Sequence, residues 1–77
     1  MTKLIHAEKS VLIEALQLWI YKTDLKASEL IRVVDCHEGF KVGVIDYIDP
    51  DTEFVSVENN QTEKEAKELR QRILEFL

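Results

Sequence analysis

The chain of 77 residues contains one cysteine, one proline and two glycines. A single cysteine excludes an internal disulfide framework, and a lone thiol fits the reducing cytoplasm best. Few glycines and prolines, with 45% hydrophobic and 32% charged residues, are typical of a compact globular chain. The sequence therefore predicts one compact cytoplasmic domain over residues 1–77.

The sequence also lacks a hydrophobic run long enough to cross a membrane. Its most apolar stretch, Val11–Ile20, is interrupted by Glu14 and Gln17, whereas a transmembrane helix needs roughly 18 or more consecutive apolar residues. Glu8 and Lys9 precede the stretch and no small-residue cleavage site follows it, so it does not match a signal peptide. We expect no contact with a membrane.

Motifs of common enzymes are absent as well: there is no Gly-rich phosphate loop, nucleophile elbow or zinc-protease helix. Asp35–Glu38 does combine a thiol, an imidazole and two carboxylates, but neighbouring residues on a strand point to opposite faces. A structural zinc site needs four Cys or His ligands, and the chain has only Cys36, His6 and His37. We therefore expect no metal and no cofactor, and we favour a non-enzymatic role.

The N-terminal part is unusually apolar for a surface helix. On a helix over residues 3–21, the polar positions form one narrow stripe and leave an apolar arc of about 220°, against the roughly 100° that one buried face requires. Because one sheet and one further helix would not cover this arc, we expect a second copy of the chain to do so. The large apolar residues predicted to form that interface are Val11, Leu12, Leu16, Leu18 and Trp19.

The middle of the chain predicts two strands. Branched residues dominate residues 30–34 and 40–45, and Gly39 suits a tight turn between them. The preceding residues 24–31 allow two interpretations. Asp24 could cap a short helix that runs to about Ile31, or the chain could enter the strand directly at Glu29 or Leu30, which we favour.

A second hairpin is expected around Asp49 and Pro50, which occupy the first two positions of a type I turn. Pairing Ile48 with Glu53 would place Asp46 opposite Val55, and hence a carboxylate on an apolar face. The three strands would then form an antiparallel meander.

Thr62 and Glu65 form a capping box, which predicts that a C-terminal helix begins here. Its apolar face contains Ala66, Leu69, Ile73, Leu74, Phe76 and Leu77. The predicted fold class is therefore α+β: a helix, a three-stranded antiparallel meander and a helix, with both helices on one face of the sheet.

Charge is distributed unevenly along the chain, whose formal net charge is −5. No Lys or Arg occurs between Lys41 and Lys64. Such an acidic segment repels phosphate backbones, so we expect no direct binding of nucleic acid, whereas it would attract a basic protein. The predicted acidic partner-binding residues are Asp46, Asp49, Asp51, Glu53 and Glu58.

These features together predict a small acidic, non-catalytic interaction module that binds and regulates another protein, as a homodimer. By analogy of size and charge alone, it would suit a phage-type inhibitor or an antitoxin-like partner. The alternative is a small enzyme or ligand-binding protein whose pocket forms at a dimer interface, with Asp46, His37 and Tyr47 as its polar groups.

Overall fold

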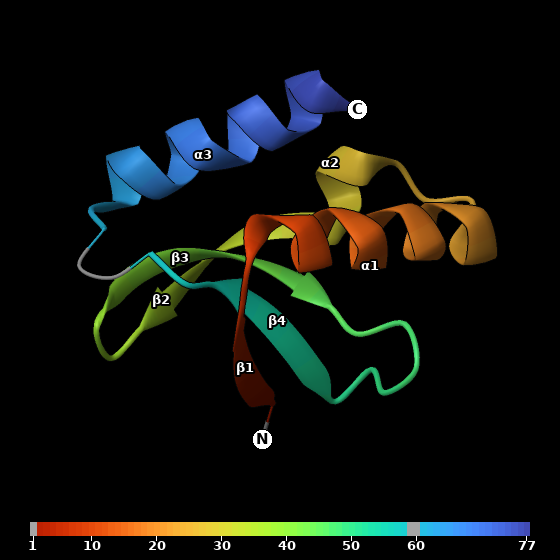
Figure 1. Ribbon diagram of the computed structural model, residues 1–77, viewed down its shortest axis with the longest axis horizontal. Coiled ribbons are helices and arrows are strands. Elements are labelled where there is room, and N and C mark those ends of the chain that lie inside the picture. Colours follow the sequence, from red (N-terminus) through yellow and green to blue (C-terminus); the bar gives the residue numbers. More distant parts are fainter. Residues whose placement is uncertain (1, 59–60) are drawn as a thin grey trace.

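The fold is α+β, as the sequence predicts, and consists of a four-stranded mixed sheet with helices packed on it (Figure 1). The structure is a computed structural model and describes residues 2–58 and 61–77. The sheet order is β1-β4-β3-β2, with β1 parallel to β4 and the other pairs antiparallel. The elements are β1 (Lys3–Ala7), α1 (Lys9–Thr23), α2 (Ala27–Leu30), β2 (Ile31–Cys36), β3 (Gly39–Ile45), β4 (Thr52–Ser56) and α3 (Glu63–Phe76). Within the described part of the chain, no helix has the length and hydropathy that crossing a membrane requires.

The N-terminal segment differs from the sequence expectation because residues 3–7 form strand β1 instead of the first turns of a helix. β1 pairs along β4, where Ile5 lies opposite Phe54, and Lys3 N donates to Asp51 O over 2.8 Å. Helix α1 begins only after Glu8, whose side chain makes no capping hydrogen bond. The predicted helix over residues 3–21 is therefore wrong in its first part, and the predicted three-stranded meander lacks the parallel strand.

The connection between α1 and β2 contains one short helix. Asp24 ends α1 in the left-handed conformation with φ of 59°, which Asp tolerates better than most residues. The single turn α2 then follows Lys26, and β2 begins at Ile31. The direct entry into a strand that we favoured is therefore wrong, although the strand itself is present.

The β2–β3 hairpin and the start of α3 confirm two local predictions. Cys36 pairs with Gly39 across a two-residue turn, and Gly39 adopts a positive φ of 117° that other residues avoid. At α3, Glu65 N donates to Thr62 Oγ1 over 3.1 Å and Thr62 N donates to Glu65 Oε1 over 2.9 Å. The hydrogen bond from the Thr62 amide also lowers the pKa of the Glu65 carboxyl.

The β3–β4 register is shifted by comparison with the predicted one. The predicted turn is present, since Thr52 N donates to Asp49 O over 2.9 Å. Glu53, however, pairs with Ile45 and not with Ile48, because residues 46–51 form a longer loop. The placement of Asp46 opposite Val55 is therefore wrong, and Val55 pairs with Gly43.

The core lies between the sheet and the helices, which Figure 1 shows above the sheet. Val42 and Val44 project from one face of β3 and join a single buried cluster with residues of α1 and α3. Ile13 and Ile20 of α1 pack against this cluster. One flank of the wide apolar arc of α1 is thus covered within the chain.

The opposite face of the sheet carries an ion pair in which the Glu53 carboxylate is buried and the Arg32 side chain is 60% exposed. Arg32 Nε and Nη2 donate to the two carboxylate oxygens of Glu53 over 2.7 and 2.9 Å. The Glu53 carboxylate lies over Gly43 on the intervening strand, where an added Cβ would come within 2.6 Å of Glu53 Oε1 and 2.7 Å of Val34 Cγ2. Because Gly43 has no side chain, the Glu53 side chain on β4 has room to contact Arg32 on β2.

Candidate functional site

The second flank of α1 lines a groove of about 180 Å³ that also involves the β3–β4 loop and β4. We call it the α1 groove. Val11 and Leu18 lie seven positions apart on the same side of the helix, with Glu14 and Ala15 between them. The residues that line the groove are Val11, Glu14, Ala15, Leu18, Asp46, Tyr47, Ile48 and Phe54.

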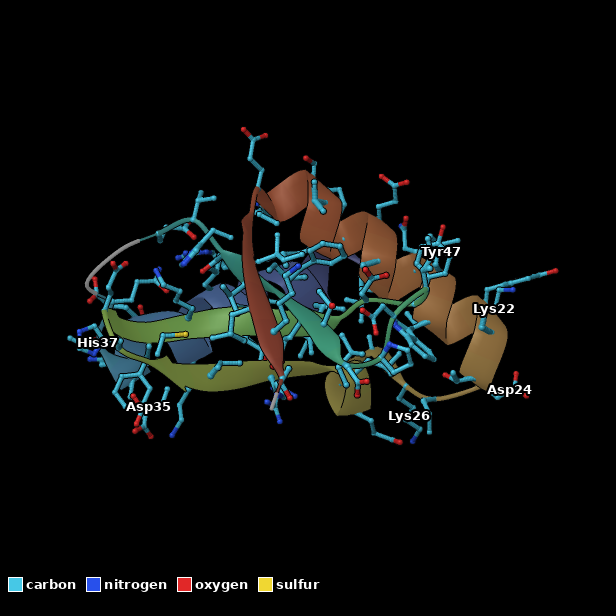
Figure 2. All side chains as sticks on the ribbon, turned by 90° about the horizontal axis from the view of Figure 1, so that it is seen from below. Lys22, Asp24, Lys26, Asp35, His37 and Tyr47 are labelled. Carbon is cyan, nitrogen blue, oxygen red and sulfur yellow. The ribbon has the colours of Figure 1, made fainter. Side chains whose placement is uncertain are left out.

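The loop wall of the groove is shaped by hydrogen bonds to its own backbone. Asp46 N donates to Thr52 O over 2.9 Å, and Ile48 N donates to Asp46 Oδ1 over 2.8 Å. These bonds fold residues 46–48 into a local turn beside α1, and Figure 2 shows Tyr47 next to that helix. Ile48 remains 76% exposed. The loop therefore presents an aliphatic side chain to solvent at the edge of an apolar groove.

The charge of the α1 groove has one sign. Glu14 on the helix and Asp46 on the loop line it from two different elements, and Asp49 and Asp51 follow in the same loop. Among the described residues, no Lys or Arg lines the groove. An apolar surface bordered by carboxylates favours a ligand that combines apolar and cationic groups.

The five predicted interface residues are distributed over different environments. Val11 is 38% exposed and Leu18 is half-buried, and both line the α1 groove. Leu12 and Leu16 are 1% and 0% exposed, because they belong to the core of the chain itself. Trp19 is half-buried, and its Nε1 is buried without a hydrogen-bond partner. Only Val11 and Leu18 are therefore placed to contact a ligand in the groove.

The five predicted acidic residues are likewise separated. Asp46 lines the groove, and Asp49 and Asp51 are exposed beside it. Glu53 is buried in its ion pair with Arg32. Glu58 is exposed beyond the end of β4, and its backbone oxygen accepts a hydrogen bond from Lys41 Nζ over 2.5 Å.

Sequence reasoning missed four members of the groove, namely Glu14, Ala15, Ile48 and Phe54. Glu14 could have been found, since it shares one helical face with Val11 and Leu18. Ile48 and Phe54 depend on the length of the β3–β4 loop, which the sequence-based register did not reproduce.

A second pocket, of about 170 Å³, lies at the other end of the molecule between β1 and the β2–β3 hairpin. We call it the hairpin pocket. Leu4, His6, Cys36, His37, Glu38 and Lys41 line it. Figure 2 shows His37 far from Tyr47, so the groups of the alternative dimer-interface pocket do not meet within one chain.

The chemistry of the hairpin pocket is limited by its thiol. Burial raises the pKa of Cys36, and the opposing effect of Lys41 is smaller. The thiol therefore stays protonated near neutral pH and is a poor nucleophile. Among the described residues, no three His, Cys, Asp or Glu side chains are placed to hold a metal ion.

A third, wider hollow of about 440 Å³ runs along α3. All five residues that line it are polar or charged and exposed, and Lys67 pairs with Glu63 over 2.8 Å. It is an ordinary solvated helix face.

Comparisons of the chain with protein-family models, with curated proteins and with solved structures found no match.

Proposed function

We propose that the protein is a small non-catalytic interaction module that binds and regulates a basic protein through the α1 groove. The carrying observation is the combination of an apolar groove with Glu14 and Asp46 at its border. Apolar contacts supply most of the affinity of such interfaces, and the surrounding charges select the partner and its orientation.

The same border argues against a symmetric dimer built groove to groove. In a two-fold contact each surface patch meets its own copy. Glu14 and Asp46 of one chain would then approach the same carboxylates of the other, and like charges in an interface are unfavourable. A basic partner would instead place cations beside these carboxylates. The same carboxylates would repel acidic proteins and so contribute to selectivity.

The alternative of a small enzyme or ligand-binding protein needs two copies in a different arrangement. Asp46 and Tyr47 of one chain would have to meet His37 of another copy. Within one chain, Asp46 and Tyr47 line the α1 groove and His37 lines the hairpin pocket, and Figure 2 shows His37 far from Tyr47. The observation in its favour is that Cys36, His6 and His37 all line the hairpin pocket. The protonated state of the thiol gives that pocket no activated nucleophile.

A charge reversal at the groove tests the proposal. Glu14→Lys places a cation beside the groove, and Glu68→Lys makes the same change on the exposed face of α3. The tagged chain and both variants are used to capture proteins from extract of the native cell, at low and at high salt. We expect a basic protein on the original chain and on Glu68→Lys, reduced roughly tenfold or more on Glu14→Lys and at high salt.

Circular dichroism of both variants controls for folding. A captured protein that binds all three chains equally, or whose binding does not depend on salt, would contradict the proposal.

A further inference from the structure

Building on the proposed function, we propose that the α1 groove recognises one large apolar side chain of the partner, flanked on both sides by Arg or Lys. This inference specifies the ligand of the groove, whereas the proposed function requires only that a basic protein binds there.

The size of the groove limits the anchor to a single side chain. An engineered cavity of about 150 Å³ lined by aliphatic and aromatic side chains holds one benzene molecule. The α1 groove measures about 180 Å³ and is lined by Val11, Leu18, Ile48 and Phe54 among others. It therefore has room for one phenylalanine or leucine side chain, and not for the apolar face of a long helix.

The positions of the carboxylates place the cations. Glu14 comes from α1 and Asp46 from the β3–β4 loop, so the two walls of the groove each contribute one carboxylate. An apolar anchor between these walls has an acidic group on either side. Basic residues before and after the anchor in the partner sequence would pair with both.

A second copy of the chain also carries one such group. Phe76 is 70% exposed near the end of α3, and Arg72 lies four residues before it on the same helix face. Within the described residues, this segment has Arg72 on one side of Phe76 and no cation on the other. Head-to-tail association through Phe76 is therefore the competing outcome in the experiment.

Blocked heptapeptides provide the test, with the ¹⁵N-labelled full chain observed by NMR titration. The first peptide has a central phenylalanine between two arginines, separated by glycines. The second replaces phenylalanine with alanine, and the third replaces both arginines with glutamates. We expect the first to shift the amide signals of Val11, Glu14, Leu18 and Ile48. The alanine peptide should bind at least about tenfold more weakly, and the glutamate peptide at least about 25-fold more weakly, which is roughly fivefold for each of the two lost arginines.

Groove variants locate the site. Ile48→Ser should weaken the first peptide about tenfold, whereas Val57→Ser, at an exposed position outside the groove, should leave binding unchanged. Phe76→Ser should also leave it unchanged, unless a second copy occupies the groove, in which case binding strengthens.

Several results would overturn the inference: equal binding of the three peptides, signal shifts confined to the hairpin pocket, or stronger binding by Phe76→Ser. Each of these is compatible with groove-dependent capture of a basic protein in the Glu14→Lys experiment. Failure of the ligand assignment can therefore be distinguished from failure of the proposed function.

Discussion

Gly43 shows how a single residue can be required for the space it leaves empty. Its backbone does not need a positive φ, but the Glu53 carboxylate occupies the place that a side chain would fill. Because this carboxylate pairs with Arg32 on β2, Gly43 allows side chains of β4 and β2, the two strands on either side of β3, to contact each other.

Gly43→Ala is therefore expected to destabilise the fold by about 2 kcal/mol, since the new methyl group must displace Glu53 or Val34. Urea unfolding followed by circular dichroism measures this difference. In a Glu53→Ala background the same substitution should have a smaller effect, because one of the two clashes is absent. An unchanged unfolding midpoint for Gly43→Ala would show that the space is not needed.

Glu53 also shows what residue-level sequence reasoning misses. The sequence analysis includes it among five acidic partner-binding residues, which would have to be accessible, and the structure buries it. Its environment depends on the register between β3 and β4 and on the neighbour across β3, both of which are set by tertiary contacts. Neither the register nor this neighbour can be inferred from the residues close to Glu53 in the sequence.

At the scale of elements, the start of α3 depends on its capping box, because Thr62 satisfies a backbone amide that the helix leaves without a partner. Thr62→Ala should reduce the free energy of unfolding by about 1 kcal/mol, measured by urea unfolding. Thr2→Ala, at an exposed position before β1, is the matched control and should have no effect. Equal stability of both variants would mean that α3 is held by packing alone.

The elements differ in how much of them the sequence predicts. The β2–β3 hairpin, the Asp49 turn and α3 have local signals, and their positions are confirmed. β1 has none that separates it from a helix, because Ile5 fits the apolar period of α1 and Glu8 makes no side-chain cap. Its conformation is decided by pairing with β4, a contact distant in sequence. The α1 groove shares this dependence, since one wall is the loop whose length was mispredicted.

For the whole molecule, the sequence led us to expect a homodimer that covers α1. The structure covers one flank of α1 internally and borders the other with Glu14 and Asp46. With a net charge of −5, repulsion between copies is strongest at low ionic strength.

We therefore expect light scattering coupled to size-exclusion chromatography to give a mass of 9.0 kDa in about 50 mM salt. Leu18→Ser should have the same mass. A dimer at this salt concentration that Leu18→Ser dissociates would restore the homodimer through the groove and contradict the charge argument.

The parallel pairing of β1 with β4 also affects the order in which the chain can assemble during synthesis. Residues 3–7 leave the ribosome before their partners at residues 52–56, which follow only after β2 and β3 have been made. Until then α1 has no complete sheet to cover, and its apolar face stays exposed to solvent. A strand that is translated before β2, β3 and β4 is thus one of the last elements to reach its final position.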